Sequence, residues 1–152
     1  MQPIISRALS HGVYIVTVRA GEKRNGMTAA WVSQVSFSPL LLMLSIAPER
    51  FSYGLIKETG FFGINTLDED LQNYAAIFGF RSGKHADKFQ GIPYSDAPNG
   101  SPILDGAVAF CECKLTDTFT AGDHSLFIGQ VLEARLLNES AEPLIFHWDD
   151  YF

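Results

Sequence analysis

Short runs of β-branched and aromatic residues divide the first third of the chain into segments that predict β-strands. Every residue in 13–18 is β-branched or aromatic, and the polar stretch 20–26 that follows predicts a hairpin connection ending in Asn25-Gly26. A second strand is expected over 27–35. A third is expected over 40–46, where a nearly continuous apolar run suits burial on both faces of a sheet.

Two later segments carry apolar residues at the spacing of amphipathic helices. In Phe51–Thr59 the apolar side chains share one helical face, and Gly60 follows as a C-cap. After a strand over 61–67, Asp68 is expected to cap a second helix. The apolar positions of that helix recur at i, i+3, i+4 and i+7, at Leu71, Tyr74, Ala75 and Phe78.

The rest of the chain predicts loop and further strands. Residues 79–99 are rich in glycine, proline and charge, which indicates a loop with one short helical turn at 87–90. The remaining strands are expected over 102–115, 125–137 and 144–148. This order favours a mainly β fold, an antiparallel barrel with short flanking helices, over an alternating parallel sheet. No repeat or linker divides residues 1–152, so a single domain is expected.

The stretch 26–48 contains no charged residue and is long enough to cross a membrane as a helix. Polar residues such as Ser33, Gln34 and Ser36 interrupt it, and lipid would leave these groups without partners. Two barrel strands separated at Ser38-Pro39 satisfy the same backbone and hide the apolar side chains. We therefore interpret the stretch as barrel strands and expect no membrane contact.

Composition and charge narrow the possible functions. With 47% hydrophobic and 18% charged residues the chain can form a core, and a formal net charge of −6 argues against nucleic acid as a partner. Only Arg7 precedes a short apolar run, so no export signal is predicted and a cytoplasmic location is expected. Cys111 and Cys113 are interpreted as small half-buried residues, because no further Cys or clustered His completes a ligand set.

Two segments near predicted strand and helix ends suit ligand binding. In 25–30, small residues let a flat ligand approach the backbone, and Thr28 offers a hydroxyl and an amide; an ordinary hairpin turn is the alternative. In 48–52, the N–H groups that open a helix, the Ser52 hydroxyl and the Arg50 guanidinium together suit a phosphate. Simple capping of the helix by Ser52 is the alternative.

His124 follows a Gly122-Asp123 turn at the start of a predicted strand. Its imidazole could hydrogen-bond a carboxamide or a phosphate in either protonation state, and a solvent-exposed turn residue is the alternative. The loop 79–99 carries a basic group that either forms a solvated face or attracts an anionic cofactor, made of Arg81, Lys84, His85 and Lys88.

In their order along the chain, these segments resemble the flavin reductase-like, FMN-binding split-barrel family over residues 9–151. The resemblance rests on GVYIVTV at 12–18, NGMTA at 25–29, VSFSPLL at 35–41, FFGINTL at 61–67, DKFQG at 87–91, PILDG at 102–106 and GDH at 122–124. The chain departs from the family pattern at Trp31 and Gln34, where smaller or hydroxylated residues are usual.

The resemblance implies a homodimer of small β-barrels, each holding FMN, or FAD, in a cleft near the subunit interface. It places the edge of strand 27–30 along the isoalloxazine ring, with the Thr28 backbone near the polar edge of that ring, and it places His124 near the nicotinamide. The full set of expected cofactor-binding residues is Met27, Thr28, Ala29, Ala30, Arg50, Phe51, Ser52, Arg81 and Lys88.

The function implied by the resemblance is an NAD(P)H:flavin oxidoreductase with NADH or NADPH as co-substrate. Reduced flavin or electrons would pass to a partner such as a monooxygenase. Hydride transfer between stacked rings needs no protein nucleophile, so neither a catalytic residue nor a metal is expected. The alternatives are a flavoredoxin-like FMN electron carrier that is reduced by a protein donor, and a binding module without a redox role.

Overall fold

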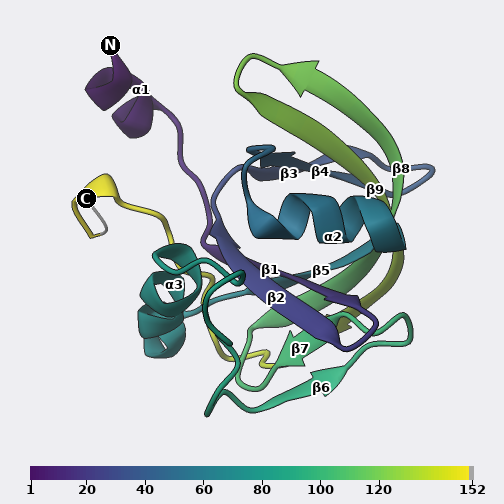
Figure 1. Ribbon diagram of the computed structural model, residues 1–152. Helices are drawn as coiled ribbons and strands as arrows, with labels where there is room; N and C mark the ends of the chain where they lie inside the picture. The colour runs from purple at the N-terminus through teal and green to yellow at the C-terminus, as the bar shows by residue number, and fades with distance from the viewer. Residues whose placement is uncertain (151–152) are drawn as a thin grey trace.

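Seven antiparallel strands form one curled sheet in the computed structural model, which describes residues 1–150 (Figure 1). The strands are β1 (Tyr14–Ala20), β2 (Lys23–Ala29), β3 (Val32–Ser36), β4 (Leu41–Ile46), β5 (Phe61–Thr66), β8 (Ala109–Ala121) and β9 (His124–Leu136). Their order across the sheet is β2-β1-β5-β8-β9-β4-β3. The expectation of a mainly β, antiparallel barrel with short flanking helices is therefore confirmed.

The barrel is split between β2 and β3, which follow one another in the chain but end the sheet on opposite sides. The predicted strand 27–35 was therefore wrong as one element, because the chain leaves one edge at Ala29 and re-enters at Val32. Ala30 and Trp31 make the crossing, and the Trp31 carbonyl accepts a hydrogen bond from the Ser45 amide at 3.0 Å. Strand periodicity cannot reveal such a change of edge, since the apolar pattern continues through it.

Three α-helices flank the sheet: α1 (Gln2–Ala8), α2 (Phe51–Thr59) and α3 (Gln72–Gly79). Figure 1 shows α1 standing away from the barrel and α2 lying across its opening, where it packs on β1 and β2. Helix α2 has the predicted bounds, and Gly60 ends it in the left-handed region at φ 77°. Asp68 caps a preceding 3₁₀ turn, η1 (Glu69–Leu71), by accepting from the Leu71 amide.

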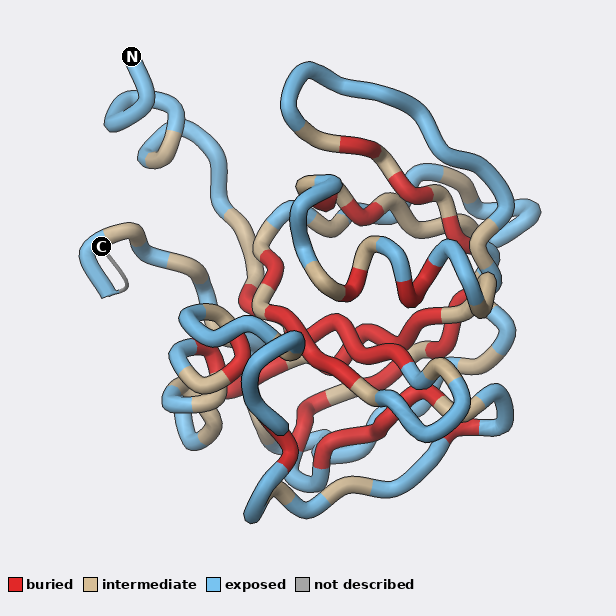
Figure 2. The backbone as a smooth tube through the Cα atoms, in the orientation of Figure 1, coloured by how far each residue is buried: buried red, intermediate tan, exposed pale blue. Residues whose placement is uncertain are grey.

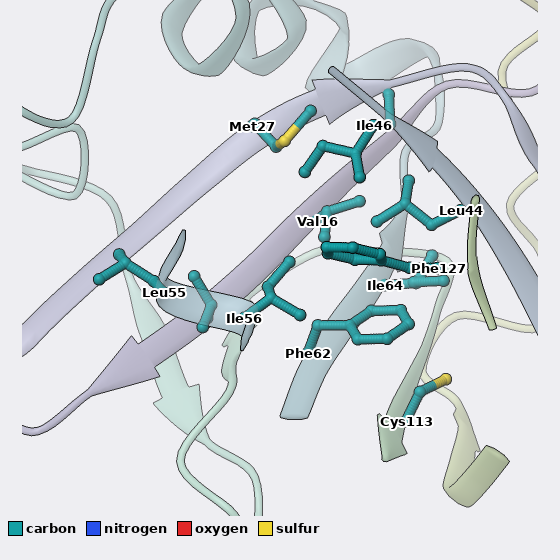
Figure 3. Packing of buried hydrophobic residues seen from close by; sticks show 12 residues of the cluster. Val16, Met27, Leu44, Ile46, Leu55, Ile56, Phe62, Ile64, Cys113 and Phe127 are labelled. Atoms are coloured by element: carbon teal, nitrogen blue, oxygen red, sulfur yellow. The ribbon is translucent and has the colours of Figure 1, made fainter. Parts of the chain in front are cut away.

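The interior of the barrel is filled by apolar side chains from most of the strands and from α2. Figure 3 shows Ile56 of α2 directed toward Phe62 and Phe127 of the strands, and Leu55 belongs to the same cluster. A second cluster lies beneath α3 and includes Val13, Ile15, Leu67, Ala75, Phe78 and Phe89. Figure 2 shows where the buried residues lie: the red segments run through the central strands and the inner face of α2.

The first hairpin turns earlier than predicted. Gly21 and Glu22 form a two-residue turn, and Gly21 has φ 62°, which a glycine adopts without steric cost. Asn25 and Gly26 were predicted to end the connection, but both lie inside β2 and are buried. The prediction failed because the Asn25 side chain has a partner distant in sequence, which local turn propensity does not take into account.

Several other boundaries also differ from prediction. The strand expected over 102–115 is divided into two strands, β7 (Pro102–Leu104) and β8, which are separated at Gly106 with φ 86°. Strand β7 pairs with a further strand, β6 (Tyr94–Asp96), which was not predicted. The strand expected over 144–148 is reduced to one bridge between Gly12 and Ile145, followed by η2 (Trp148–Asp150). The helical turn expected at 87–90 is a plain turn, and α1 was not predicted.

The uncharged stretch 26–48 forms strands, as expected, but its third strand is less buried than predicted. Only Leu44 and Ile46 of β4 are buried, because residues 1–150 leave the second face of the sheet partly open there. Cys111 and Cys113 are free thiols, the first half-buried and the second fully buried, and the pKa of Cys113 is raised by its hydrogen bond with Cys111 and by burial.

Within residues 1–150, no helix has the length and apolar character needed to cross a membrane.

Candidate functional site

A cleft of about 220 Å³ opens at the split of the barrel, between the ends of β2 and β4. One wall is the end of β2, and the other combines Ser45 and Ile46 of β4 with His124 at the start of β9. A second pocket of the same volume adjoins it and extends past the N-terminus of α2. The two spaces form one continuous groove because they share five lining residues, Met27, Thr28, Arg50, Gly79 and Phe80.

The groove brings together all ten residues that the sequence singled out for cofactor and nicotinamide binding. The first space, called here the ring cleft, is lined by Met27, Thr28, Ala29, Ala30, Arg50 and His124. The second, called here the phosphate pocket, is lined by Met27, Thr28, Arg50, Phe51, Ser52, Arg81 and Lys88. The two other members of the basic group, Lys84 and His85, line neither space and lie in a third hollow farther along the same loop.

The Thr28 backbone lies on an open edge of the sheet. Strand β2 ends the sheet, so one of its edges has no neighbouring strand. The Gly26 carbonyl faces that edge, since it accepts from the Lys88 side chain, and residues two apart in a strand direct their N–H and C=O groups to the same edge. The N–H and C=O of Thr28 therefore face the ring cleft, and its hydroxyl is used elsewhere, donating to the Ala75 carbonyl at 2.7 Å.

Helix α3 borders the ring cleft with Ala75 and Gly79 and packs directly against β2. A Cβ atom at Gly79 would lie 3.2 Å from the Thr28 hydroxyl oxygen, which leaves no slack for a larger residue. A Cβ atom at Gly83 would collide with the Asn25 amide. Both glycines thus let the 79–83 segment pack directly against β2.

The phosphate pocket is built around the first turn of α2. Ser52 lies in that turn and its hydroxyl accepts a hydrogen bond from the buried Asn25 amide at 2.8 Å, so the alternative that Ser52 caps the helix was wrong. Arg50 is the N-cap residue and makes no side-chain cap bond. Because the Ser52 oxygen accepts from Asn25, its own O–H is left to donate, alongside the unsatisfied N–H groups of the helix start.

Lys88 is buried at the floor of the phosphate pocket. Its ammonium donates to the carbonyls of Gly26 and Phe78, each at 2.9 Å, and so connects β2 to the end of α3. Burial, and then the neighbouring Arg50 guanidinium, lower the pKa of Lys88 to about 8. Two cations facing one pocket create a positive potential that an anion would neutralise.

His124 stands at the mouth of the ring cleft. Its Nδ1 lies 2.7 Å from a carboxylate oxygen of Asp123, and this hydrogen bond lowers the pKa of that carboxyl. A proton on Nδ1 fixes the neutral ring in one tautomer and leaves Nε2 to meet a ligand. The Trp31 ring lies beside the imidazole with centroids 5.1 Å apart and the two ring planes tilted by 51°.

Some residues of the groove were not expected from the sequence. Asn25 stood in the candidate segment 25–30 but not among the expected cofactor-binding residues, and Trp31 was assigned to an ordinary strand; both line the groove. Phe146 and Trp148 reach the ring cleft from the C-terminal segment, and their rings meet edge to face at 5.7 Å. The departures of Trp31 and of the C-terminal stretch that contains Trp148 from the family pattern were the signals available, and nothing local indicated Phe146.

The groove therefore suits a flat, mostly apolar ring that carries an anionic tail. The ring cleft offers open backbone groups on β2 for the polar edge of such a ring and aromatic side chains at its mouth. The phosphate pocket supplies Arg50, Lys88, Ser52 and a helix N-terminus. The residues present fit a flavin mononucleotide. Among residues 1–150 no three His, Cys, Asp or Glu side chains gather as a metal site.

The family model described as "Flavin reductase like domain" matches residues 6–152 of the chain. A ferric-chelate reductase (NAD(P)H) from Archaeoglobus fulgidus is 31% identical over 134 residues, which cover 87% of this chain and 79% of the relative. A putative diflavin flavoprotein from a Nostoc species is 35% identical over 142 residues, which cover 91% of this chain. This chain spans only 24% of that relative's length.

Solved structures agree with the sequence comparison. An NADH:FAD oxidoreductase from Streptomyces globisporus superposes with a TM-score of 0.85 at 27% identity, covering 91% of this chain and 82% of that chain. Component B of a nitrilotriacetate monooxygenase from Mycobacterium thermoresistibile has a TM-score of 0.87 at 30% identity, with coverage of 96% and 82%.

Proposed function

This chain belongs to the flavin reductase-like domain family of FMN-binding split barrels, and from that premise we propose that it is an NAD(P)H:flavin oxidoreductase. The proposed reaction transfers a hydride from NADH or NADPH to FMN, or to FAD, held in the groove. The observation that carries the proposal is the direct continuity of the ring cleft with a pocket that holds two cationic side chains, Arg50 and Lys88.

The side chains of the groove have distinct roles in this proposal. Arg50, Lys88 and Ser52 bind the flavin phosphate through charge-assisted hydrogen bonds. The backbone of Thr28 orients the polar edge of the ring, and Ala75 and Gly79 of α3 border the ring cleft beside it. A bound flavin supplies the hydride-accepting chemistry, and the protein contributes position and electrostatics.

His124 is proposed to position the nicotinamide over the exposed face of the ring. With Nδ1 bonded to Asp123, the Nε2 atom is the nitrogen available to the carboxamide of a nicotinamide. Trp31 supports the imidazole from the side and reduces the water around it. No side chain in this arrangement needs to act as a nucleophile or a base.

We propose that the chain works as a homodimer and passes electrons to a separate acceptor. Val35, Phe37 and Leu40 are exposed at the β3–β4 hairpin, with Phe37 at 90%, and such a patch is typical of a subunit contact. A monooxygenase is one proposed acceptor, since a similar structure is a monooxygenase component.

A flavoredoxin-like electron carrier is the second candidate. It is favoured by the diflavin flavoprotein relative, in which a segment like this chain makes up only 24% of the length. In that function the flavin would stay bound and would receive electrons from a protein instead of from a nicotinamide.

Anaerobic stopped-flow mixing of the FMN-loaded chain with NADH and with NADPH tests the proposal. We expect the visible flavin absorbance to bleach with at least one donor, as hydride transfer requires. Retained flavin that neither donor bleaches would favour the electron carrier and would contradict the reductase. Failure of the purified chain to bind added FMN or FAD would contradict both candidate functions.

A further inference from the structure

Three aromatic side chains from distant parts of the sequence line the ring cleft. They are Trp31, in the crossing between β2 and β3, and Phe146 and Trp148, near the C-terminal end of the described chain. Together they are called here the aromatic rim. Trp31 is 43% exposed and the other two are half-buried, so part of their apolar surface remains accessible. Accessible aromatic surface gathered at one cleft is typical of a ligand-binding site.

The backbone holds Trp31 at the cleft. Its carbonyl accepts a hydrogen bond from the Ser45 amide of β4 at 3.0 Å, and Ser45 itself lines the ring cleft. Trp31 therefore stands where the chain crosses the split of the barrel. Its position is set by this contact with β4 and not by an unsupported loop.

The C-terminal segment is also bonded to the rest of the chain where it reaches the cleft. The Phe146 amide donates to the His11 carbonyl at 2.8 Å, next to the bridge between Gly12 and Ile145. The Trp148 ring lies against the Phe146 ring, edge to face. These contacts place both aromatic side chains of the segment at the ring cleft.

The aromatic rim separates the ring cleft from a second, mostly apolar space. All three side chains also line a hollow of about 360 Å³, which is bordered by residues of α1, β3 and β4 as well. They therefore form a wall of the ring cleft. Because the backbone of this wall is already fixed, the wall loses little conformational freedom when a flat ring binds beside it, and this favours slow release of that ring.

From this geometry we propose that the aromatic rim retains the flavin in the groove between reactions, so that the flavin is a prosthetic group and does not leave as a reduced product. Trp31 and Trp148 are the residues that determine this retention. The electron acceptor must then come to the mouth of the ring cleft. The inference rests on the proposed flavin site, but it does not depend on which donor reduces the flavin.

The rate of FMN release tests the proposal, followed by timed gel filtration and the flavin absorbance of the protein fraction. We expect the wild-type chain to elute with its FMN. Trp31→Ala and Trp148→Ala should each release FMN at least about fivefold faster, with less than about twofold change in the association rate constant, because the lost contacts act on the bound ring. Trp148→Phe keeps an aromatic ring and should release FMN within about twofold of the wild-type rate.

The matched control is Phe119→Ala, which removes an exposed aromatic ring at the end of β8 that lines neither the ring cleft nor the phosphate pocket. Its release rate should equal that of the wild-type chain. Thermal unfolding of each flavin-free variant shows whether the fold is preserved. Neither tryptophan is buried, so we expect the unfolding temperatures to stay close to that of the wild-type chain.

Two outcomes overturn the inference. The first is a wild-type chain that binds FMN in a titration but elutes without it, and the second is release from both alanine variants at the wild-type rate. Slow release from a wild-type chain whose flavin neither NADH nor NADPH bleaches would instead contradict the proposed reductase and support the retention. Failure of the wild-type chain to bind FMN or FAD would contradict both.

Discussion

The buried amide of Asn25 in β2 donates a hydrogen bond of 2.8 Å to the hydroxyl of Ser52 in the first turn of α2. This contact joins the two elements that enclose the phosphate pocket, although the residues are 27 positions apart in sequence. It fixes the orientation in which the Ser52 O–H can donate to an anion.

Ser52→Ala should therefore weaken both the fold and flavin binding. The Asn25 amide would remain buried without its acceptor, so we expect the free energy of unfolding to fall by about 1–3 kcal/mol. FMN affinity should fall several-fold, measured by titration of flavin fluorescence. The control is Ser95→Ala, which alters an exposed serine of β6 and should change neither quantity. Unchanged stability and affinity in Ser52→Ala would contradict the assigned contact.

Flavin affinity should depend on pH through Lys88. The pKa of Lys88 is lowered to about 8, so its ammonium loses its proton as the pH rises above that value, and it then attracts a phosphate less. We expect FMN affinity to fall between about pH 7 and pH 10 and Lys88→Met to flatten this dependence. The groups that share the pocket with Lys88 are Arg50, Arg81 and Glu49.

The same shift has the opposite effect on the stability of the flavin-free chain. An unfolded lysine keeps its higher pKa, so between about pH 8 and pH 10.5 the unfolded state binds more protons than the folded state. The contribution of Lys88 to stability should therefore increase with pH across that window. Chemical denaturation at several pH values measures it, and a wild-type slope equal to that of Lys88→Met would contradict the burial of this charge.

His124→Ala should affect the nicotinamide reaction and leave flavin binding intact. We expect kcat/KM for the better donor to fall about tenfold, as for loss of one or two oriented hydrogen bonds, with little change in FMN affinity. Asp123→Asn keeps the imidazole but weakens the bond that orients it, so its effect should be smaller. An equal loss of FMN affinity in His124→Ala would place the imidazole at the flavin instead.

Phe37→Asp should shift a dimer toward monomers. Phe37 is 90% exposed beside Val35 and Leu40, and a charge there would oppose burial of the patch in a subunit contact. Light scattering after size-exclusion chromatography measures the mass. Phe119→Asp, on the exposed end of β8, is the control and should leave the dimer intact. A monomeric wild-type chain would contradict the homodimer proposal.

The sequence predicted the strand and helix content well because the apolar periodicities are local. Helix α2 and its glycine C-cap follow directly from the side-chain spacing in Phe51–Thr59. The break at Ala30 and Trp31 could not be predicted, since it depends on which edge of the sheet each strand joins. Whether a strand such as β4 is covered on one face or two likewise depends on tertiary packing.

The candidate site was predicted in part for a similar reason. Resemblance indicated the residues of β2, the start of α2 and His124, because their segments have recognisable patterns. The role of Asn25 could not be read locally, since its partner lies in another element. The sequence indicated a charge at Lys88 but not its burial, which depends on the carbonyls of Gly26 and Phe78 coming together around it.

Comparison of FMN with riboflavin, which lacks the phosphate, tests the central claim most directly. If the groove binds a flavin with its phosphate at Arg50, Ser52 and Lys88, FMN should bind at least about tenfold more tightly than riboflavin, since each charge-assisted hydrogen bond contributes about 1.5–3 kcal/mol. The Ser52→Ala and Lys88→Met variants should reduce that difference. Equal affinity of the wild-type chain for the two flavins, or no affinity for either, would contradict the account.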